Sequence, residues 1–328
     1  MAVTIVDIAR AVNMTHGTVS RALRDSLQVN SETRKLIKLT ARKMGYRPNL
    51  VARSFRTNRT FTLGMICGEV HTPHFAEATQ VIHKEAEARG YSLYLAVTEW
   101  DRKRQMEELQ KLFQRRVDGV LLWSSDLLKP GEVEYETLME ARLPVVMLNH
   151  AVKGFSSVVS DWQPGMDEAV RYLKSKGFGR VGFLGQSNVD KSTYENRLTF
   201  LRACRENAVE PVEYECLTTL EDAQRAGRDI GRDADRPGAL IVLSDYIATG
   251  VIHGLDDVGV NVPRDMAIVG SDGTEMGAYF RPPLTTIFQD REKLAVTAMD
   301  VLLEKLNDDD APCRTVALPT RLVVRASA

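Results

Sequence analysis

The sequence of 328 residues predicts a small all-helical domain followed by a larger α/β body. Residues 1–60 are strongly basic and show only helical periodicity, whereas residues 61–328 alternate short apolar runs with amphipathic segments. The first sixty residues carry twelve Lys and Arg against three acids, a net charge of +9, and the remainder carries −10. This asymmetry favours a nucleic-acid-binding module on an acidic body. On charge alone, a solvated basic face without a partner remains an alternative.

The composition indicates a globular protein without a membrane segment or a disulfide framework. No run approaches eighteen apolar residues, and Asp7 and Arg10 interrupt the N-terminus where a signal peptide needs an unbroken apolar stretch. We therefore expect a cytoplasmic protein. The four cysteines have no paired spacing, so we expect buried, reduced thiols and no zinc site. Pro73 stands between His71 and His74 and disfavours a helical metal-ligand pair.

Three helices are predicted in the basic segment. Apolar residues at helical spacing follow Thr4, a potential N-cap, and Asn13 tolerates the left-handed backbone of a tight turn. Thr15 can cap a second helix, which makes a helix-turn-helix, and Asn30 can cap a third over about 31–44, which ends at a glycine. The side chains expected to pack inward are Ile5, Ile8, Ala9, Val12, Val19, Ala22, Leu23, Leu36, Ile37 and Leu39 to Ala41.

The second helix is expected to expose short or hydrogen-bonding side chains. Such side chains allow close approach to a DNA major groove and can bind base edges and phosphates. Gly17 costs about 1 kcal/mol of helix stability relative to alanine, which is understandable if the backbone must approach a partner. Three ordinary small helices are the alternative. The residues expected on the exposed face are Thr15, His16, Gly17, Thr18, Ser20, Arg21 and Arg24.

The segments "TIVDIARAVNMTHGTVSRAL", "VNSETRKLIKLTARKMGYRPN" and "VARSFRTNRT" resemble the N-terminal domain and hinge of the lactose-repressor family of bacterial transcription regulators. The resemblance implies that 15–24 is the recognition helix, that His16 and Gly17 stand where the family chooses its operator, and that Arg21 reaches a base edge. This sequence has "NMT" in the turn where the family usually has glycine, valine and serine, and Gly17 where a base-contacting side chain is common. The residues implied to hold phosphates are Thr4, Thr18, Ser20, Asn30, Thr33 and Tyr46.

The stretch "NLVARSFRTNRT" places Phe55 between Arg53 and Arg56. In the family the segment matching 49–56 is a hinge helix that forms on operator DNA in the dimer and wedges an apolar residue into the central base step. Minor-groove proteins insert Phe, Leu or Ile between base steps, and flanking arginines neutralise phosphates. Packing of Phe55 against the body as a linker anchor is the alternative. The resemblance implies DNA contacts for Asn49, Ala52, Arg53 and Phe55.

The body is predicted to contain parallel sheets wrapped by helices, because buried apolar runs alternate with amphipathic segments. The pattern restarts near Ser157, which predicts two similar lobes and a ligand cleft between facing strand ends. The expected strands are "FTLGMIC", "YSLYLAV", "DGVLLW", "PVVMLN", "RVGFLG", "ALIVLS" and "MAIVG". The expected helices are "HFAEATQVIHKEAEARG", "DRKRQMEELQKLFQRR", "GMDEAVRYLKSKG", "YENRLTFLRACRENA" and "REKLAVTAMDVLLEKL".

Enzyme motifs are not complete in this sequence. "GQSNVDKS", 185–192, is one residue short of a phosphate-binding P-loop, and Asp190 stands where the second glycine belongs. There is no nucleophile elbow and no zinc-protease helix. We therefore expect no catalytic activity and no cofactor.

The body resembles the effector-binding core of the same family, in "VDGVLLW", "LSDYIATGVIHGLDDVGVNVPRDMAIVGSDG" and "PPLTTIFQD". This implies the fold of periplasmic sugar-binding proteins and a cleft in which Arg197 and Asp272 grip ligand hydroxyls, a task suited to a guanidinium and a carboxylate. A surface or interlobe ion pair is the alternative for both residues. Arg291 stands where sugar binders often place an aromatic ring, which favours an anionic ligand. The resemblance implies a cleft lined by His74, Phe75, Asn149, Arg197, Ser244 and Asp272.

Together these patterns predict a helix-turn-helix domain over 1–48, a hinge helix and linker over 49–60, and an effector-binding and dimerisation domain over 61–328. The expected function is a ligand-responsive transcription repressor that binds a near-palindromic operator as a homodimer and senses a sugar or sugar derivative. A purine or a protein co-regulator is the alternative effector, and a solute-binding protein is a remote alternative. "LPTRLVVRASA" has no leucine heptad, so we expect no tetramerising coil.

Overall fold

The chain divides into two compact units, Met1–Thr60 and Phe61–Ala328. The structure is a computed structural model. It describes residues 3–23, 25–46, 54, 57, 59–123, 131–141, 143–186, 191–217, 219–308 and 310–328.

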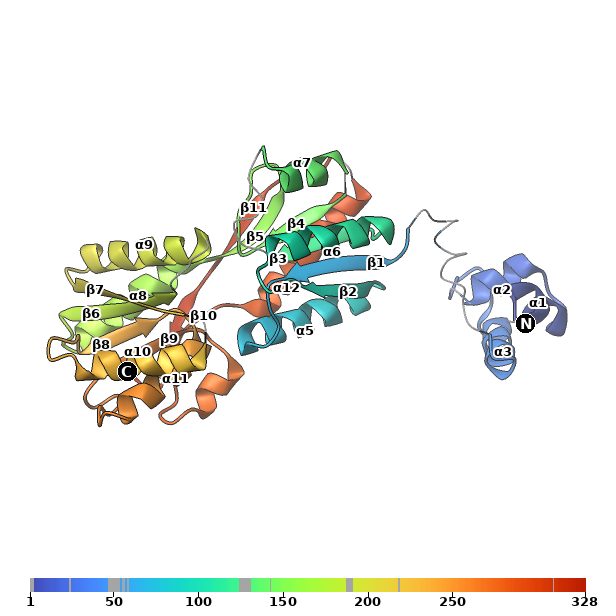
Figure 1. The fold of residues 1–328 in the computed structure, drawn as a ribbon. Helices are drawn as coiled ribbons and strands as arrows, with labels where there is room; N and C mark the ends of the chain where they lie inside the picture. The colour runs from blue at the N-terminus through green and yellow to red at the C-terminus, as the bar shows by residue number, and fades with distance from the viewer. Residues whose placement is uncertain are drawn as a thin grey trace. The chain divides into compact units, whose positions relative to one another are not determined.

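The N-terminal unit contains α1 (Ile5–Ala11), α2 (His16–Leu23) and α3 (Ser31–Lys43) (Figure 1). Thr4 and Asp7 form a capping box at the start of α1, and Asn13 has the left-handed φ of 50° that the turn requires. The Asn30 side chain accepts a hydrogen bond from Thr33 N at 2.8 Å and caps α3. The predicted caps and turn are therefore confirmed.

Residues from all three helices form the hydrophobic core of this unit. Leu36 and Leu39 were expected inside, yet they are 49% and 53% exposed. Helix α3 instead presents Ile37 and Ala41, which lie four residues apart on one face, so the two leucines lie beside the contact. The buried residues are Ile8, Ala9, Val19, Ala22, Val29, Ile37 and Ala41.

The first lobe of the body is a six-stranded parallel sheet with the order β11-β5-β4-β3-β1-β2 (Figure 1). Its strands are β1 (Thr62–Cys67), β2 (Ser92–Val97), β3 (Gly119–Trp123), β4 (Val145–Leu148), β5 (Ser156–Asp161) and β11 (Thr315–Pro319). One hydrophobic cluster packs α5 (Pro73–Ala88) and α12 (Arg291–Asn307) on the sheet. A second packs α6 (Arg102–Gln114) and α7 (Val133–Glu140) on the other face.

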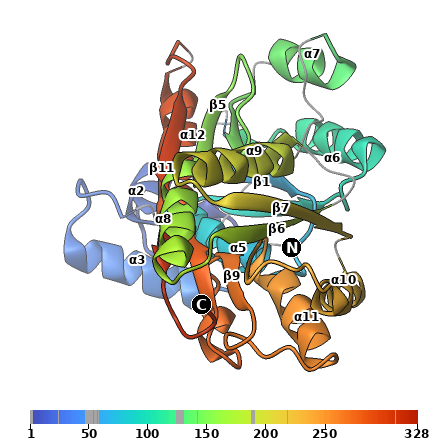
Figure 2. The same ribbon diagram turned by 90° about the vertical axis from the view of Figure 1, so that its left-hand side faces the viewer.

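The second lobe repeats this plan with the order β12-β10-β9-β8-β6-β7, in which only β12 runs antiparallel to its neighbour. Its strands are β6 (Arg180–Gln186), β7 (Glu210–Cys216), β8 (Ala239–Val242), β9 (Ala267–Asp272), β10 (Thr285–Phe288) and β12 (Arg321–Val323). Its helices are α8 (Trp162–Ser175), α9 (Lys191–Glu206), α10 (Leu220–Arg232) and α11 (Asp245–Asp256). Figure 2 shows α8 and α9 on one side of this sheet and α10 and α11 on the other.

The chain passes between the lobes three times: after β5, after β10, and between β11 and β12. The predicted restart near Ser157 is wrong by a few residues, because β5 completes the first sheet and the second lobe begins at Trp162 in α8. The predicted helix at 291–306 also belongs to the first lobe, where α12 packs against α5. The two lobes are predicted correctly, but their boundary is not a single point in the sequence.

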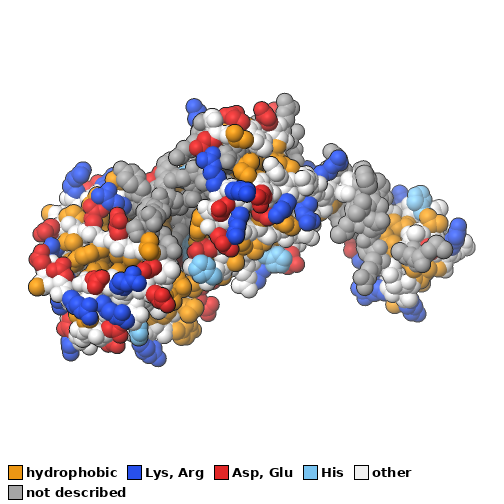
Figure 3. Space-filling model, in the orientation of Figure 1, with side chains coloured by type: hydrophobic (Ala, Val, Ile, Leu, Met, Phe, Trp, Pro, Cys, Tyr) orange, Lys and Arg blue, Asp and Glu red, His pale blue; other side chains and the backbone are white. Residues whose placement is uncertain are grey.

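The visible face of the body carries intermixed acidic and basic side chains (Figure 3). Within the described part of the chain, no helix combines the length and the apolar character needed to cross a membrane.

Candidate functional site

The exposed face of α2 carries most of the side chains predicted to contact DNA. Thr15, His16 and Arg21 are exposed, and Thr18 is half-buried. The Thr15 hydroxyl caps the helix by accepting a hydrogen bond from Thr18 N at 3.2 Å. Ser20 was expected on the exposed face, but it is only 8% exposed. A small side chain next to the buried Val19 is covered by its neighbours, so Ser20 lies at the edge of this surface.

Gly17 has no role inside the N-terminal unit that requires glycine. A Cβ built there would come no closer than 3.8 Å to Arg21 Nη2 and 3.9 Å to Thr15 Oγ1, which are ordinary contact distances. A glycine inside a helix nevertheless costs about 1 kcal/mol relative to alanine. Packing among the described residues of the unit does not offset this cost.

Two of the residues predicted to hold phosphates, Thr4 and Asn30, serve as helix caps here. Thr4 Oγ1 lies 2.7 Å from Asp7 Oδ2, and Asn30 binds Thr33 N. Tyr46 packs against the small core. The predictions for Arg24, Asn49, Ala52, Arg53 and Phe55 fall outside the described residues, so the hinge and wedge contacts stay predictions.

In the body, the first turn of α5 meets the carboxyl end of β9, where the two lobes touch. His74 Nδ1 lies 3.6 Å from Asp272 Oδ1, and both residues are buried. The edge of the His74 ring contacts Trp123, with the centroids 5.4 Å apart, and Phe75, at 5.5 Å. His74 and Asp272, about two hundred positions apart in the sequence, thus form a polar contact beside the aromatic rings of Phe75 and Trp123.

Burial controls the charge of this pair. Burial and the nearby Asp245 carboxylate raise the pKa of Asp272 well above its usual value, although hydrogen bonding to Ser244 and the charge of Arg291 oppose the shift. Burial, assisted by Arg291, lowers the pKa of His74 to about 3. His74 is therefore a neutral imidazole at pH 7, and Asp272 is poised to act as donor or acceptor toward a ligand.

The backbone at Asp272 is held in a sparsely populated conformation, with φ of 123°. Its Oδ1 accepts a hydrogen bond from Gln289 Nε2 at 3.1 Å, and its Oδ2 accepts one from Asp245 N at 3.3 Å. Strain of this kind costs on the order of 1–3 kcal/mol and tends to occur at ligand sites. The surrounding hydrogen bonds fix the direction of the carboxyl group.

Two buried polar atoms of the side chains that contact Asp272 lack a hydrogen-bond partner among the described residues. They are His74 Nδ1 and Gln289 Oε1. A buried polar group without a partner costs about 1–3 kcal/mol, so native proteins seldom leave several together unless a ligand or water satisfies them. The arrangement indicates a site for a molecule with several hydrogen-bonding groups.

Three aromatic side chains, Phe75, Trp100 and Trp123, form a cluster next to His74, which we call the aromatic wall. Phe75 contacts Trp123 at 4.7 Å and Trp100 at 5.7 Å between centroids. Trp100 has a left-handed φ of 60°, and a Cβ at Gly68 would lie 2.2 Å from its ring, so glycine is required there. The sequence reasoning missed both tryptophans. Each lies at or just beyond the carboxyl end of a parallel strand, which is the usual location of ligand contacts.

Asn149 and Ser244, both predicted to line the cleft, lie at the ends of secondary-structure elements and bind the backbone. Asn149 Oδ1 accepts hydrogen bonds from Ser160 N at 3.0 Å and Ser160 Oγ at 3.1 Å. Ser244 Oγ accepts one from Tyr246 N at 3.1 Å and caps α11.

Arg197 is not brought to Asp272 in this structure. Its guanidinium forms an ion pair with Glu213 on β7, with Nη2 2.9 Å from Oε1, and it shares no hydrogen bond with Asp272 among the described residues. For Arg197, this arrangement matches the alternative given in the sequence analysis, a surface ion pair. The Glu213 carboxylate on β7 balances the charge of the Arg197 guanidinium.

Arg291 is also used within the protein. Its guanidinium donates to the backbone carbonyls of Asp272 at 2.6 Å and Gly273 at 2.8 Å, and it pairs with Glu77 Oε2 at 2.8 Å. The expectation that Arg291 favours an anionic ligand loses its basis, because Glu77 neutralises this charge. Within the described residues, no cluster of three or more His, Cys, Asp or Glu side chains could hold a metal ion.

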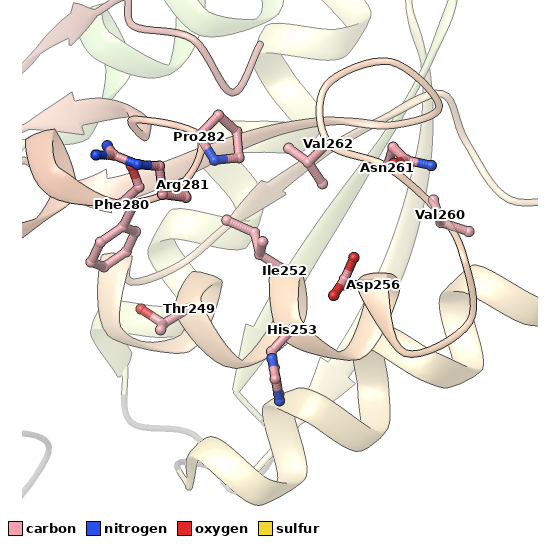
Figure 4. A pocket seen from close by; sticks show the side chains of 10 residues that line it. All are labelled: Thr249, Ile252, His253, Asp256, Val260, Asn261, Val262, Phe280, Arg281 and Pro282. Atoms are coloured by element: carbon pink, nitrogen blue, oxygen red, sulfur yellow. The ribbon is translucent and has the colours of Figure 1, made fainter.

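The second lobe also carries a surface cavity of about 420 Å³ between α11 and two loops, called here the α11 hollow (Figure 4). Apolar side chains from all three segments form much of its lining, with Asp256, His253 and Arg281 among the polar groups. The residues that line it are Thr249, Ile252, His253, Asp256, Val260, Asn261, Val262, Phe280, Arg281 and Pro282.

A helix-turn-helix unit joined to a two-lobed body, with a buried acid where the lobes meet, defines the class of ligand-responsive transcription regulators. The family model "Bacterial regulatory proteins, lacI family" matches residues 4–49, and the model "Periplasmic binding protein-like domain" matches 170–328. The chain is 30% identical over 332 residues to the HTH-type transcriptional repressor PurR of Edwardsiella ictaluri, covering 99% of this chain and 96% of the relative. It therefore belongs to the lacI family of bacterial regulatory proteins, as its sequence resemblance predicted.

Two further comparisons agree. The ribose operon repressor of Escherichia coli is 30% identical over 334 residues, covering 99% of both chains. The lac repressor dimer bound to operator and an anti-inducer superimposes with a TM-score of 0.84 at 21% identity, covering 100% of this chain and 99% of the other, which shows the shared fold. These relatives are transcription repressors, so the prediction of a DNA-binding regulator rather than an enzyme is confirmed.

Proposed function

We propose that this protein is a repressor that binds a near-palindromic operator as a homodimer and is regulated by a sugar or sugar derivative bound between the lobes. The observation that carries the proposal is the junction at Asp272, where the buried carboxyl lies beside His74 and the His74 ring contacts Phe75 and Trp123. Sugars suit such a site because they combine several hydroxyl groups with an apolar ring face. The name of the ribose operon repressor supports the same class of ligand.

A purine is the second candidate effector. The PurR relative is 30% identical over nearly the whole chain, and a flat heterocycle would pack on Trp123 and Phe75. Asp272 and Gln289 would then bind ring nitrogens or exocyclic groups.

The operator-binding part of the proposal rests on residues 1–60. Their net charge of +9 suits the phosphate backbone, and Gly17 leaves space on the face of α2 that a major groove would occupy. The hinge wedge at Phe55 belongs to the same proposal.

The homodimer is supported by the α11 hollow and its neighbours. Tyr279 immediately precedes Phe280, which lines the hollow, and is 75% exposed; Met276 is 57% exposed in the same short segment. A two-fold interface brings the same patch of both subunits together, so a patch with a projecting apolar group beside a hollow can complement itself. We assign this surface to a second copy of the chain.

A thermal-shift screen of the full chain against sugars, sugar acids, sugar phosphates and purines tests the effector class. A ligand at a hundredfold excess over its Kd stabilises the folded state by about 2.7 kcal/mol. We expect a neutral sugar to raise the unfolding temperature and to change operator affinity. A response to purines alone would favour the second candidate, and a ligand that binds an Asp272→Ala variant unchanged would overturn the site.

A further inference from the structure

The contact between the lobes depends on one carboxylate, that of Glu77 in α5 of the first lobe. Its Oε1 accepts a hydrogen bond from Glu275 N at 3.2 Å, and its Oε2 pairs with Arg291 Nη2 at 2.8 Å. Glu275 follows β9 in the second lobe, and Arg291 follows directly on the crossing after β10. Glu77 thus pairs with Arg291, the first residue of α12 and so part of the first lobe, and binds the backbone of Glu275 in the second lobe.

Arg291 extends this contact to the effector site. Its side chain is only 11% exposed, and its other donors bind the carbonyl oxygens of Asp272 and Gly273. The three groups form a continuous chain from α5 through the guanidinium to the strained backbone that carries the Asp272 carboxyl. Hydrogen bonds to charged groups contribute more to stability than hydrogen bonds between neutral groups.

The contacts of Glu77 and Arg291 with the second lobe exist only while the lobes are close together. The chain crosses between the lobes in three short segments, and such connections allow hinge closure. Opening of the cleft separates α5 and the start of α12 from the end of β9. It breaks the bond of Glu77 with Glu275 N and the bonds of Arg291 with the Asp272 and Gly273 carbonyls, whereas the Glu77–Arg291 pair stays within the first lobe.

We propose that Glu77 and Arg291 form an interlobe latch that holds the empty cleft closed and positions Asp272 for the effector. The latch sets the fraction of molecules that are open in the absence of effector. An effector that enters through the open form then binds with an affinity reduced by that fraction, so the latch also sets the sensitivity of regulation. Its link to the effector rests on the proposed function, whereas its effect on lobe closure does not.

The test measures the distance between the lobes in the full-length protein without effector. Spin labels are attached to cysteines introduced at the exposed positions Lys84 in α5 and Glu221 in α10, in a Cys313→Ser background because the other cysteines are buried. Labelled protein is diluted into unlabelled protein so that distances within one subunit dominate. Pulsed electron resonance then gives the populations of closed and open forms.

Glu77→Gln removes the charge, and Arg291→Lys keeps the charge but loses the forked geometry. We expect each to lower the ratio of closed to open forms about tenfold, as the loss of one charge-assisted contact implies. The double variant should open little further than either single one, because Glu77 holds the guanidinium through which Arg291 binds the second lobe, so both changes weaken one connected set of contacts. Asp300→Asn is the matched control: its partner Arg89 also joins α12 to α5, at 2.8 Å, but entirely within the first lobe.

The outcomes separate the latch from the effector site. Wild-type distance distributions in Glu77→Gln and Arg291→Lys, with a normal circular dichroism spectrum, would overturn the latch whatever the effector is. An equal shift in Asp300→Asn would also overturn it, since the effect would then reflect general loosening of α5 and α12. Failure of every compound in the thermal-shift screen would count against the proposed effector and leave the distance result intact.

Discussion

Replacing Gly17 by alanine should change the stability of α2 and the affinity for operator DNA in opposite directions. The added Cβ meets nothing closer than 3.8 Å, so α2 accommodates it without strain. Alanine is favoured over glycine in a helix by about 1 kcal/mol, which corresponds to about a fivefold lower opening equilibrium. The same methyl group stands on the face proposed to enter the major groove. Crowding a well-packed contact by one methyl costs on the order of 1–3 kcal/mol, so operator affinity should fall by about fivefold to a hundredfold.

Hydrogen exchange of α2 amides in the full chain measures the stability of the helix, and fluorescence anisotropy with an operator selected from random DNA measures affinity. Gly45→Ala is the control for the stability half. Gly45 has φ of 70°, so alanine there should destabilise the N-terminal unit, by about 1 kcal/mol, instead of stabilising it. If Gly17→Ala stabilised α2 and left operator affinity unchanged, the reasoning about close approach would be refuted. Faster exchange in α2 would show instead that the space around Gly17 has been misjudged.

Three further predictions concern charge and assembly. Operator affinity should fall by orders of magnitude between roughly 50 and 200 mM salt, with a log-log slope of about −0.9 per phosphate contact; a flat titration would exclude residues 1–60 as the phosphate-binding part. The raised pKa of Asp272 contributes stability below its unfolded pKa near 4, and this contribution is lost as pH rises through the folded pKa. The unfolding temperature of Asp272→Asn should therefore rise relative to that of the parent as pH increases through the folded pKa of Asp272, and the variant should bind effector weakly; an unchanged pH profile of unfolding temperature would contradict the assignment. Tyr279→Asp should convert the dimer to monomer in light scattering, whereas the exposed Val133→Asp in α7 should not; a dimeric Tyr279→Asp would place the interface elsewhere.

The sequence predicted elements whose burial is visible in their own residues. The caps at Thr4 and Asn30 and strands β1, β2, β3, β4, β6, β8 and β9 follow from local pattern, whereas β5 and β10, although largely buried, were not predicted. Strand β7 was missed because it lies at the edge of its sheet and its glutamates alternate with half-buried residues. Helix α10 was missed because small residues make its contact with α11: a Cβ at Gly227 would lie 2.4 Å from the Val251 carbonyl oxygen. Such packing leaves few apolar residues in the sequence to reveal it.

In the candidate site, too, some features could be predicted from the sequence and others could not. Asp272 was predicted from the family resemblance, and its position at the end of β9 agrees with the rule that strand ends face ligand clefts. The partners of Arg197 and Arg291 could not, because Glu213 and Glu77 reach them only after the strands and helices have packed. A charged residue matched to a family motif therefore identifies a position, whereas its partner depends on which acid the fold places nearest.

The return of α12 and β11 to the first lobe affects how the protein can be made. A ribosome synthesises the helix-turn-helix unit first, and this unit has its own core. The first lobe, although encoded next, lacks both a sheet strand and the helix over its α5 face until residues 291–319 have emerged. A chain that ended after β10 would thus contain the complete helix-turn-helix unit, but its first lobe would lack α12 and β11 and its second lobe would lack β12. Both lobes therefore need the last forty residues, and premature termination there would leave neither lobe with its complete sheet.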